Sequence, residues 1–383
     1  MINGIIITPF QLLEDKALLC EGGKILDLKD KKESFPLLQD VEIIDAKGGY
    51  VVPGYIDIHI HGGGGADVMD GEYEALKKIA VTHSRFGTTS FVPATMTMSK
   101  EKIIKSLDNI RLTKQKGTGA AEILGINLEG PFISSEKKGA QKEENIKKAS
   151  QQEFLEYNSA AGNLIRLVTI APEIPGALEF IRWLHQQGII VAVGHSNATY
   201  QQTVEGIQAG ISHVTHVFNA MRGIHHREPG VAGAALTFPD LTVEMIADGI
   251  HLHPVILKLL TQVIGNEKLI LVTDAMRAAG FKAGTYDLGG QEVTVAQGEA
   301  RLADGTLAGS VLTMEKAVKN MVTKAGVSLL NALQMASYNP AKCLGLHGKK
   351  GSLEQGKDAD IVILNRDLET DLTMVSGEVV FQK

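Results

Sequence analysis

The chain has 383 residues, of which 44% are hydrophobic and 21% are charged, and its formal net charge is −6. A chain of this length can bury one large hydrophobic core and still form a smaller second domain. The acidic balance excludes a general nucleic-acid-binding protein, which would carry a basic surface, and no apolar run approaches the roughly 20 residues that span a bilayer.

The cysteine content points to a reducing compartment. Only Cys20 and Cys343 are present, far apart in the sequence and outside any metal-binding or redox pattern. The first residues also lack the basic and apolar segments of a signal peptide. We therefore expect two free thiols and a cytoplasmic protein.

Both ends of the chain consist of short segments with strand character. The predicted strands are residues 4–8, 17–20, 24–28, 41–45, 360–364 and 378–381. We expect one small β-sandwich domain built from residues 1–53 plus 350–383. A catalytic domain of residues 54–349 lies between these two parts in the sequence.

The first strand of the central domain carries the most informative motif. Residues 55–61 predict a strand that ends at the glycine run 62–65. His59 and His61 lie two residues apart, so their side chains point to the same face. Neutral imidazoles are favoured ligands of zinc and similar cations. This strand end therefore predicts a metal site with room for a substrate beside it.

Strand-like and helical segments then alternate along the central domain. The apolar runs are residues 55–61, 90–95, 122–129, 165–173, 189–195, 214–219, 242–248 and 269–274. Most are nearly continuous, as parallel strands covered on both faces are. Helices are predicted between them, for example at residues 73–86, 101–116, 177–187 and 200–209. Eight such units predict a (β/α)8 TIM-like barrel, with a hairpin at residues 287–307 inserted in the last unit.

Residues that can bind a metal or move a proton gather at the ends of these runs, where a barrel carries its active site. The candidate metal ligands are His59, His61, Glu129, His195 and His216. They suffice for two divalent cations that share Glu129, and zinc, iron, manganese and cobalt all suit such ligands. Asp274 is the best candidate for the general base toward a water that the metal activates. One histidine alone is equally well explained as a polar cap on a strand, but the whole set is not.

The other histidines carry less information. His213 is three residues from His216 and is expected to face away from the metal ligands. The remaining ones are expected to pack or to lie on the surface: His83, His185, His225, His226, His253 and His347.

A second group of residues, after the sixth and seventh runs, suits an anion. The Arg227 guanidinium can bind a phosphate through two hydrogen bonds. Backbone N–H groups near Asn219 and Ala220 can add donors. His251 follows the seventh run and can contact a polar substrate.

Together these motifs resemble the amidohydrolase superfamily and, within it, the N-acetylglucosamine-6-phosphate deacetylase family. The resemblance covers nearly the whole chain and rests on PGYIDIHIHG at 53–62, LEGPF at 128–132, VGHS at 193–196, THVFNAM at 215–221, REPG at 227–230, ADGIH at 247–251, VTDA at 272–275 and LAGS at 307–310. It implies hydrolysis of the N-acetyl group of N-acetyl-D-glucosamine 6-phosphate to D-glucosamine 6-phosphate and acetate, a step of amino-sugar catabolism.

The resemblance also implies roles for single residues. It implies a metal on Glu129, His195 and His216, with Asp274 as the acid-base residue. It implies a homodimer in which Arg227 reaches the phosphate in the neighbouring active site. The other implied substrate contacts are Ala140, Asn219, Ala220, His251, Leu307, Ala308 and Gly309.

One position departs from the pattern of the family. Some members carry a histidine that polarises the acetyl carbonyl where this chain has Gln141. A glutamine can donate a hydrogen bond but carries no charge. We expect Gln141 at the substrate, and we infer that the second metal on His59 and His61 supplies the polarisation that Gln141 cannot.

Three alternatives remain at this point. The substrate could be the galacto epimer, N-acetylgalactosamine 6-phosphate. A cyclic-amide hydrolase shares the motif of His59 and His61, but it bridges two metals with a carboxylated lysine, and the fourth run here contains no lysine. A catalytically dead scaffold would have lost ligands, and none is missing here.

Overall fold

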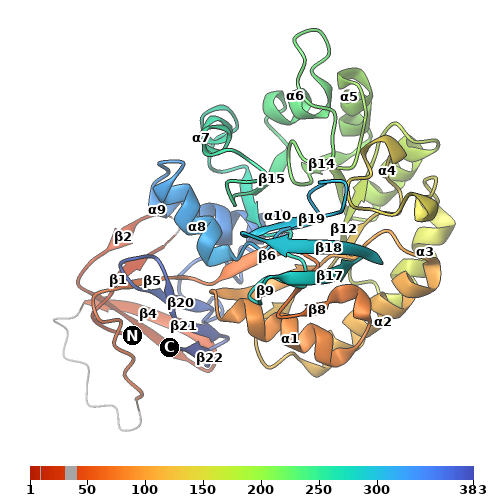
Figure 1. Cartoon of the computed structure of the whole chain (residues 1–383). Coiled ribbons are helices and arrows are strands. Elements are labelled where there is room, and N and C mark those ends of the chain that lie inside the picture. Colours follow the sequence, from red (N-terminus) through yellow and green to blue (C-terminus); the bar gives the residue numbers. More distant parts are fainter. Residues whose placement is uncertain (9, 31–40) are drawn as a thin grey trace.

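The computed structural model describes residues 1–8, 10–30 and 41–383. Parallel strands form its centre, and helices surround them (Figure 1). The strands that follow one another are β6 (Tyr55–Ile60), β9 (Thr88–Pro93), β11 (Ile126–Glu129), β12 (Ile165–Ile170), β13 (Ile190–Val193), β14 (Ile211–Val214), β15 (Thr242–Ile246) and β16 (Leu269–Val272). The alternating parallel α/β class predicted from the apolar runs is confirmed.

Strand pairing runs in chain order. β6 pairs with β9, and β11 to β16 form one sheet in which each strand pairs with the next, all in parallel. A parallel bridge between Ala94 and Asn127 joins β9 to β11. A second bridge, between Ile60 and Ala275, joins β6 to the residues after β16. The first and last parallel strands therefore lie side by side, and all carboxyl ends meet at one rim.

Helices follow the strands in turn: α1 (Tyr73–Ser84), α2 (Lys100–Lys116), α3 (Gln151–Ala160), α4 (Ala177–Gln186), α5 (Tyr200–Ala209), α6 (Gly230–Thr237), α7 (Pro254–Val263) and α8 (Met314–Thr323). The four helices predicted from sequence agree with these bounds within two residues. The ends of α5 show why. Thr199 and Gln202 form a capping box at its start, and Gly210 ends it with a positive φ of 129°. Among the described residues, no helix combines the length and apolarity needed to cross a membrane.

The sixth strand differs from the prediction. The sequence predicts a strand at residues 214–219, whereas β14 ends at Val214. The residues that follow form a turn, in which Phe218 and Ala220 adopt positive φ values of 71° and 47°. Apolar residues continue past the strand because this turn is itself partly buried, so the apolar run predicted the strand too late in the chain.

Strands from both chain ends meet in one sheet. Its order is β2 (Leu12–Leu13), β1 (Ile5–Ile7), β5 (Tyr50–Pro53), β20 (Ile361–Leu364), β21 (Thr370–Val375) and β22 (Glu378–Gln382). The strand predicted at residues 41–45 is wrong, because Val41 and Ile43 are exposed and only Asp45 forms a bridge, to Ile2. The strand that joins the sheet here is instead β5, which pairs with β1 and β20 and leads directly into β6.

A separate hairpin of β3 (Lys16–Glu21) and β4 (Lys24–Asp30) packs beside this terminal sheet. Leu18 and Ile25 of the hairpin share a small apolar core with Ile6, Val51 and Ile361 of the sheet. This core is distinct from the large one around the parallel strands. Cys20 and Cys343 are both free, as expected.

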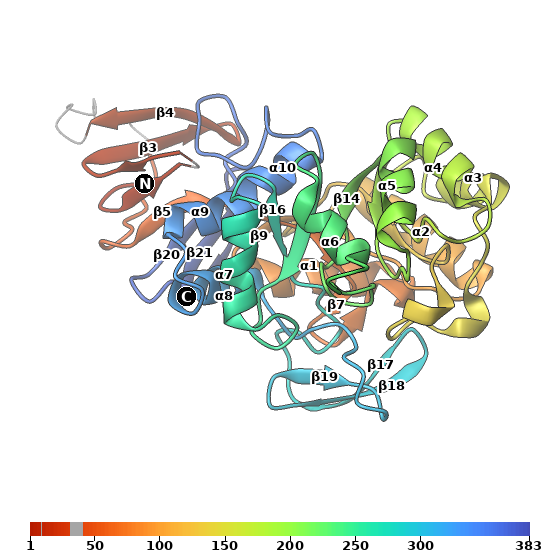
Figure 2. The ribbon, with the colours of Figure 1, turned by 90° about the horizontal axis from the view of Figure 1, so that it is seen from above.

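An antiparallel insert stands between β16 and α8. It consists of β17 (Gly284–Leu288), β18 (Gln291–Ala296) and β19 (Glu299–Arg301). Figure 2 shows it projecting from one side of the molecule. The hairpin predicted at residues 287–307 is therefore confirmed, with a third strand added.

Candidate active site

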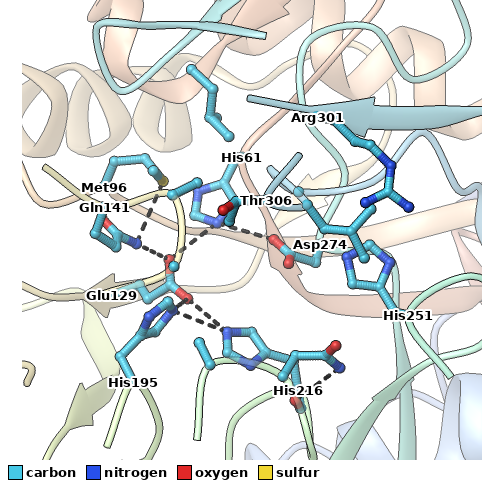
Figure 3. A pocket seen from close by; sticks show the side chains of 17 residues that line it. His61, Met96, Glu129, Gln141, His195, His216, His251, Asp274, Arg301 and Thr306 are labelled. Atoms are coloured by element: carbon cyan, nitrogen blue, oxygen red, sulfur yellow. Dashed lines mark hydrogen bonds and ion pairs between the residues drawn. The ribbon is translucent and has the colours of Figure 1, made fainter. Parts of the chain in front are cut away.

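Six buried side chains with ligand or acid-base chemistry meet at the carboxyl ends of the parallel strands. Figure 3 shows His61, Glu129, His195, His216 and Asp274 of this set. His59 lies in β6, and Glu129 is the last residue of β11. His195, His216 and Asp274 each lie two residues beyond a strand end, with positive φ values of 47°, 27° and 48°. Non-glycine residues seldom adopt this conformation. These sharp turns therefore direct the three side chains into the site, whereas a continued strand would not.

Glu129 is the centre of the cluster. Its Oε1 lies 3.2 Å from Nε2 of both His195 and His216 and 3.3 Å from Nε2 of His59. Its Oε2 lies 3.2 Å from Nε2 of His61. Oδ1 of Asp274 lies 3.2 Å from the same His61 nitrogen. The carboxylate of Glu129 thus touches both candidate metal groups, namely His59, His61 and Asp274 in one and Glu129, His195 and His216 in the other.

Two imidazoles of the cluster are fixed to the backbone through their second nitrogen. Nδ1 of His61 lies 3.2 Å from the carbonyl oxygen of Ala94, and Nδ1 of His195 lies 3.0 Å from that of Lys137. A carbonyl oxygen only accepts, so these Nδ1 atoms carry the proton. In the neutral imidazoles that bind a metal, the Nε2 lone pairs then face the cluster. Converging imidazole nitrogens and carboxylate oxygens are the donor set of a divalent transition metal.

The electrostatics of the cluster also fit a cation. Burial by itself would raise the pKa of Glu129, but the charge of His59 and hydrogen bonds from His195 and His216 hold it well below its usual range. Burial would lower the pKa of His61, but hydrogen bonds to Asp274 and Glu129 raise it to about 10. The buried carboxylates are thus ionised and demand positive partners. A divalent metal can replace the imidazolium protons in that role, so the residues present fit a divalent metal.

The cluster forms one wall of a cavity of about 410 Å³, within the size range of small-molecule sites. Residues expected from the sequence that line it are His61, Glu129, Ala140, Gln141, His195, His216, Asn219, Ala220, His251, Asp274, Leu307 and Gly309. The expected residues His59 and Ala308 are buried behind this lining.

Arg227 does not line the cavity of its own chain. It is exposed, and its Nη1 lies 2.6 Å from Nε2 of the neighbouring His226. Its side chain is therefore free to contact another molecule. His251 is held more firmly, since its Nδ1 lies 2.6 Å from Oδ2 of Asp248.

Gln141 has partners other than those expected from the sequence. Its amide nitrogen donates to Oε2 of Glu129 at 2.8 Å, and its amide oxygen accepts from the backbone N–H of Thr97 at 2.7 Å. These two bonds fix which end of the amide faces the carboxylate. Gln141 thus supports Glu129 from the edge of the cavity.

The sequence did not point to several residues of the site. Met96, Gly139, Leu288, Arg301 and Thr306 also line the cavity. Arg301 comes from β19 and lines the same cavity as His251. Glu244 is fully buried beneath the cluster, with Oε2 3.0 Å from Nδ1 of His59. A glutamate inside the apolar segment 242–247 was the signal that could have found it.

The remaining histidines lie outside the cluster. His213 is buried in β14, with Nε2 3.0 Å from Oε1 of Glu244. His83 is buried in α1, and its Nε2 lies 2.9 Å from the carbonyl oxygen of Gly62. The exposed ones are His185, His225, His226, His253 and His347.

Comparison with known proteins agrees with this geometry. Residues 50–380 match the amidohydrolase family. The N-acetylglucosamine-6-phosphate deacetylase of Bacillus subtilis (strain 168) is 41% identical over 379 residues, which cover 98% of this chain and 95% of that protein. The N-acetylgalactosamine-6-phosphate deacetylase of Escherichia coli O157:H7 is 40% identical, with coverages of 88% and 90%.

Solved structures agree as well. The crystal structure of N-acetylglucosamine-6-phosphate deacetylase from Pasteurella multocida is similar with a TM-score of 0.93 and 34% identity, and the match covers 99% of this chain and 98% of that one. Sequence motifs, site geometry and these relatives agree. The chain belongs to the amidohydrolase family.

Proposed function

We propose that the protein hydrolyses the N-acetyl group of N-acetyl-D-glucosamine 6-phosphate, which gives D-glucosamine 6-phosphate and acetate. The observation that carries this proposal is the meeting of Asp274 with the Glu129-centred cluster at the wall of one cavity. Relatives that match nearly the full chain bear the name of this activity.

Asp274 is the proposed acid-base residue. Burial alone would raise the pKa of its carboxyl group, but the hydrogen bond with His61 and the charge of His59 hold it below its usual value. The ionised carboxylate takes a proton from the attacking water and passes it to the amide nitrogen as the C–N bond breaks. The amine then leaves neutral, and the water oxygen stays in the acetate.

The cluster is proposed to hold two divalent cations per chain, of zinc, iron, manganese or cobalt. His59, His61 and Asp274 surround one position, His195 and His216 the other, and Glu129 reaches both. A cation bound there polarises the acetyl carbonyl and makes water a better nucleophile.

The substrate contacts are proposed to come from two chains. Within one chain they are Ala140, Asn219, Ala220, His251, Leu307 and Gly309, with Gln141 at the edge, together with Ala308 behind the lining. Arg227 is exposed and does not line its own cavity, which supports a homodimer in which it binds the phosphate in the neighbouring site.

The proposed framework is a (β/α)8 barrel of residues 54–349 and a small β-sandwich domain of residues 1–53 plus 350–383. Supporting observations are the chain-order pairing of the parallel strands and the separate apolar core of the terminal sheets. The free thiols agree with a cytoplasmic location.

A second candidate substrate is N-acetylgalactosamine 6-phosphate, because one relative of 40% identity bears that name. A cyclic-amide hydrolase is less well supported. That class needs a bridging lysine, and no lysine lines the cavity in the described part of the chain.

A substrate panel tests the proposal. The metal-loaded protein is assayed for acetate and free amine from N-acetylglucosamine 6-phosphate, its galacto epimer, unphosphorylated N-acetylglucosamine and a cyclic amide. We expect the highest kcat/KM for the first substrate. Equal turnover with and without the phosphate, or turnover of the cyclic amide alone, would overturn the proposal.

A further inference from the structure

Glu244 is a buried carboxylate that the proposed chemistry does not use. It lies in β15 among apolar neighbours, with Val243 and Met245 also fully buried. It does not line the cavity, so it cannot touch a substrate there. Burying a carboxylate is costly unless hydrogen-bonding partners compensate, so its contacts should explain its presence.

One oxygen of Glu244 holds a residue from each candidate metal group. Oε2 lies 3.0 Å from Nδ1 of His59 and accepts the backbone N–H of His216 at 3.1 Å. The other oxygen, Oε1, lies 3.0 Å from Nε2 of His213. His213 is fixed in turn, since its Nδ1 lies 2.6 Å from Oγ1 of Thr242.

The contact with His59 selects the form in which this side chain can bind a metal. A carboxylate oxygen accepts, so the proton of His59 lies on Nδ1. In the neutral form that binds a metal, the lone pair of His59 is then on Nε2, which faces Oε1 of Glu129 at 3.3 Å and Nε2 of His61 at 3.3 Å. Carboxylate partners of this kind fix both the orientation and the basicity of a histidine ligand.

The contact with His216 acts through the backbone. His216 has a positive φ of 27°, a conformation that its surroundings must hold in place. Its own Nδ1 has no hydrogen-bond partner in the described part of the chain. The imidazole is therefore oriented by the contact of Nε2 with Glu129 and by the backbone, whose N–H group donates to Glu244.

We propose that Glu244 is the positioning residue of the metal centre, and that it sets the metal affinity of the position formed by His59, His61 and Asp274. This inference rests on the two-metal part of the proposed function. Its effect on the second position is smaller, because Glu244 holds only the backbone of His216 there. Loss of a carboxylate that orients a histidine ligand lowers metal affinity by roughly 10- to 100-fold.

Two variants separate orientation from charge. Glu244→Leu removes both acceptor oxygens. Glu244→Gln keeps one oxygen, which can still accept from His59 and His216, while its amide faces His213. His213 can then accept on Nε2 if its proton moves to Nδ1, next to Thr242 Oγ1. Val243→Ala, at a fully buried position of the same strand, is the control for damage to β15.

The experiment measures metal binding directly. Metal-free proteins are titrated with Co²⁺ in competition with a chromophoric chelator, and circular dichroism checks the fold. We expect two equivalents in wild type and in Val243→Ala. Glu244→Leu should bind one of the two Co²⁺ equivalents at least 10-fold more weakly than wild type. The affinity of Glu244→Gln for that equivalent should lie between those of wild type and Glu244→Leu. If Glu244→Leu does not fold, a weakening of about 3-fold or more in Glu244→Gln supports the inference.

If Glu244→Leu folds and its Co²⁺ affinities are unchanged, the positioning role of Glu244 is refuted. If only Glu244→Gln folds, unchanged affinities in that variant refute it. Equal weakening in Val243→Ala would also overturn it. Deacetylase activity is scored separately. A wild type that hydrolyses no sugar phosphate refutes the proposed function, while a selective loss of metal in the Glu244 variants still supports the positioning role.

Discussion

The amide of Gln141 joins Glu129 to the backbone of Thr97, donating to Oε2 of Glu129 at 2.8 Å and accepting from the N–H of Thr97 at 2.7 Å. Both polar ends are therefore used within the protein. The sequence led us to expect this residue at the acetyl group, but the structure shows it supporting the central carboxylate of the cluster.

Replacing Gln141 should therefore affect stability as well as activity. Gln141→Leu leaves the buried N–H of Thr97 without its acceptor, a loss worth about 1–3 kcal/mol of the free energy of unfolding. Gln141→Glu keeps that acceptor but places a carboxylate against Glu129, so it should destabilise chiefly the metal-free protein. Urea unfolding with and without metal measures the free energy of unfolding of both variants. Two variants as stable as wild type would show that the bonds contribute little.

Asp274→Asn should remove most of the deacetylase activity. An amide cannot take a proton from water or pass one to the amine, and general acid-base catalysis typically contributes 10²–10⁴-fold. We expect kcat to fall by about that factor while KM changes little. Metal content, measured in parallel, shows whether the loss is chemical. A nearly normal kcat would refute the assignment.

The number of metals can be tested at His59 and His61. Elemental analysis should find close to two equivalents per wild-type chain and about one after both are changed to Asn, because the ligands left suffice for a single cation. The double variant should lose much of its kcat, and adding Gln141→His should restore part of it. One metal in wild type together with a fully active double variant would contradict the two-metal proposal.

Phosphate recognition can be assigned by comparing two arginines. Arg227→Ala should raise KM for the phosphorylated sugar by about 10- to 100-fold, because a charge-assisted pair to phosphate is worth about 1.5–3 kcal/mol. Turnover of the unphosphorylated sugar should barely change. Arg301→Ala is the matched variant, since Arg301 lines the cavity within its own chain. An effect of Arg301→Ala alone would place phosphate recognition within a single subunit.

Variants at Arg227 and Asp274 together test the proposed homodimer. Mixed dimers of Arg227→Ala and Asp274→Asn chains should regain activity, because one of the two sites then has an intact arginine and an intact base. Absence of recovery in verified mixed dimers would argue against a site shared between subunits.

Much of the fold could be predicted because local chemistry marks its boundaries. Most of the parallel strands are nearly continuous apolar runs, and Thr199, Gln202 and Gly210 define α5 almost by themselves. The meeting of the two termini also followed from their strand character. The strand at residues 41–45 failed because Val41 and Ile43 are apolar yet exposed, and a sequence does not show which apolar residues find partners.

The site was predictable in composition more than in geometry. Ligand and acid-base residues stand out at the ends of apolar runs, so the set around Glu129 was found. The left-handed turns at His195, His216 and Asp274 were not, because nothing in their identity favours a positive φ. Glu244 was missed for another reason. Its partner His59 is 185 residues away, a separation that strand alternation cannot bridge.

His83 gives a test of stability against pH that is separate from activity. Burial lowers the pKa of its imidazole to about 4, although the hydrogen bond to Gly62 opposes this. In the unfolded chain the pKa is about 6.5. Between these values the unfolded state binds the proton and the folded state does not, so stability rises with pH.

The contribution of His83 is complete above about pH 6.5 and falls away toward pH 4, by about 3 kcal/mol in total. His83→Gln can still donate to the carbonyl of Gly62 but does not titrate. Between pH 7 and pH 5 the wild type should therefore lose about 2 kcal/mol more of its free energy of unfolding than the variant. Urea unfolding of both metal-free proteins at the two pH values measures this difference, in which the titration of the metal ligands cancels. The same pH dependence in both proteins would mean that His83 is protonated in the folded state, and that its burial is compensated in a way the bond to Gly62 does not explain.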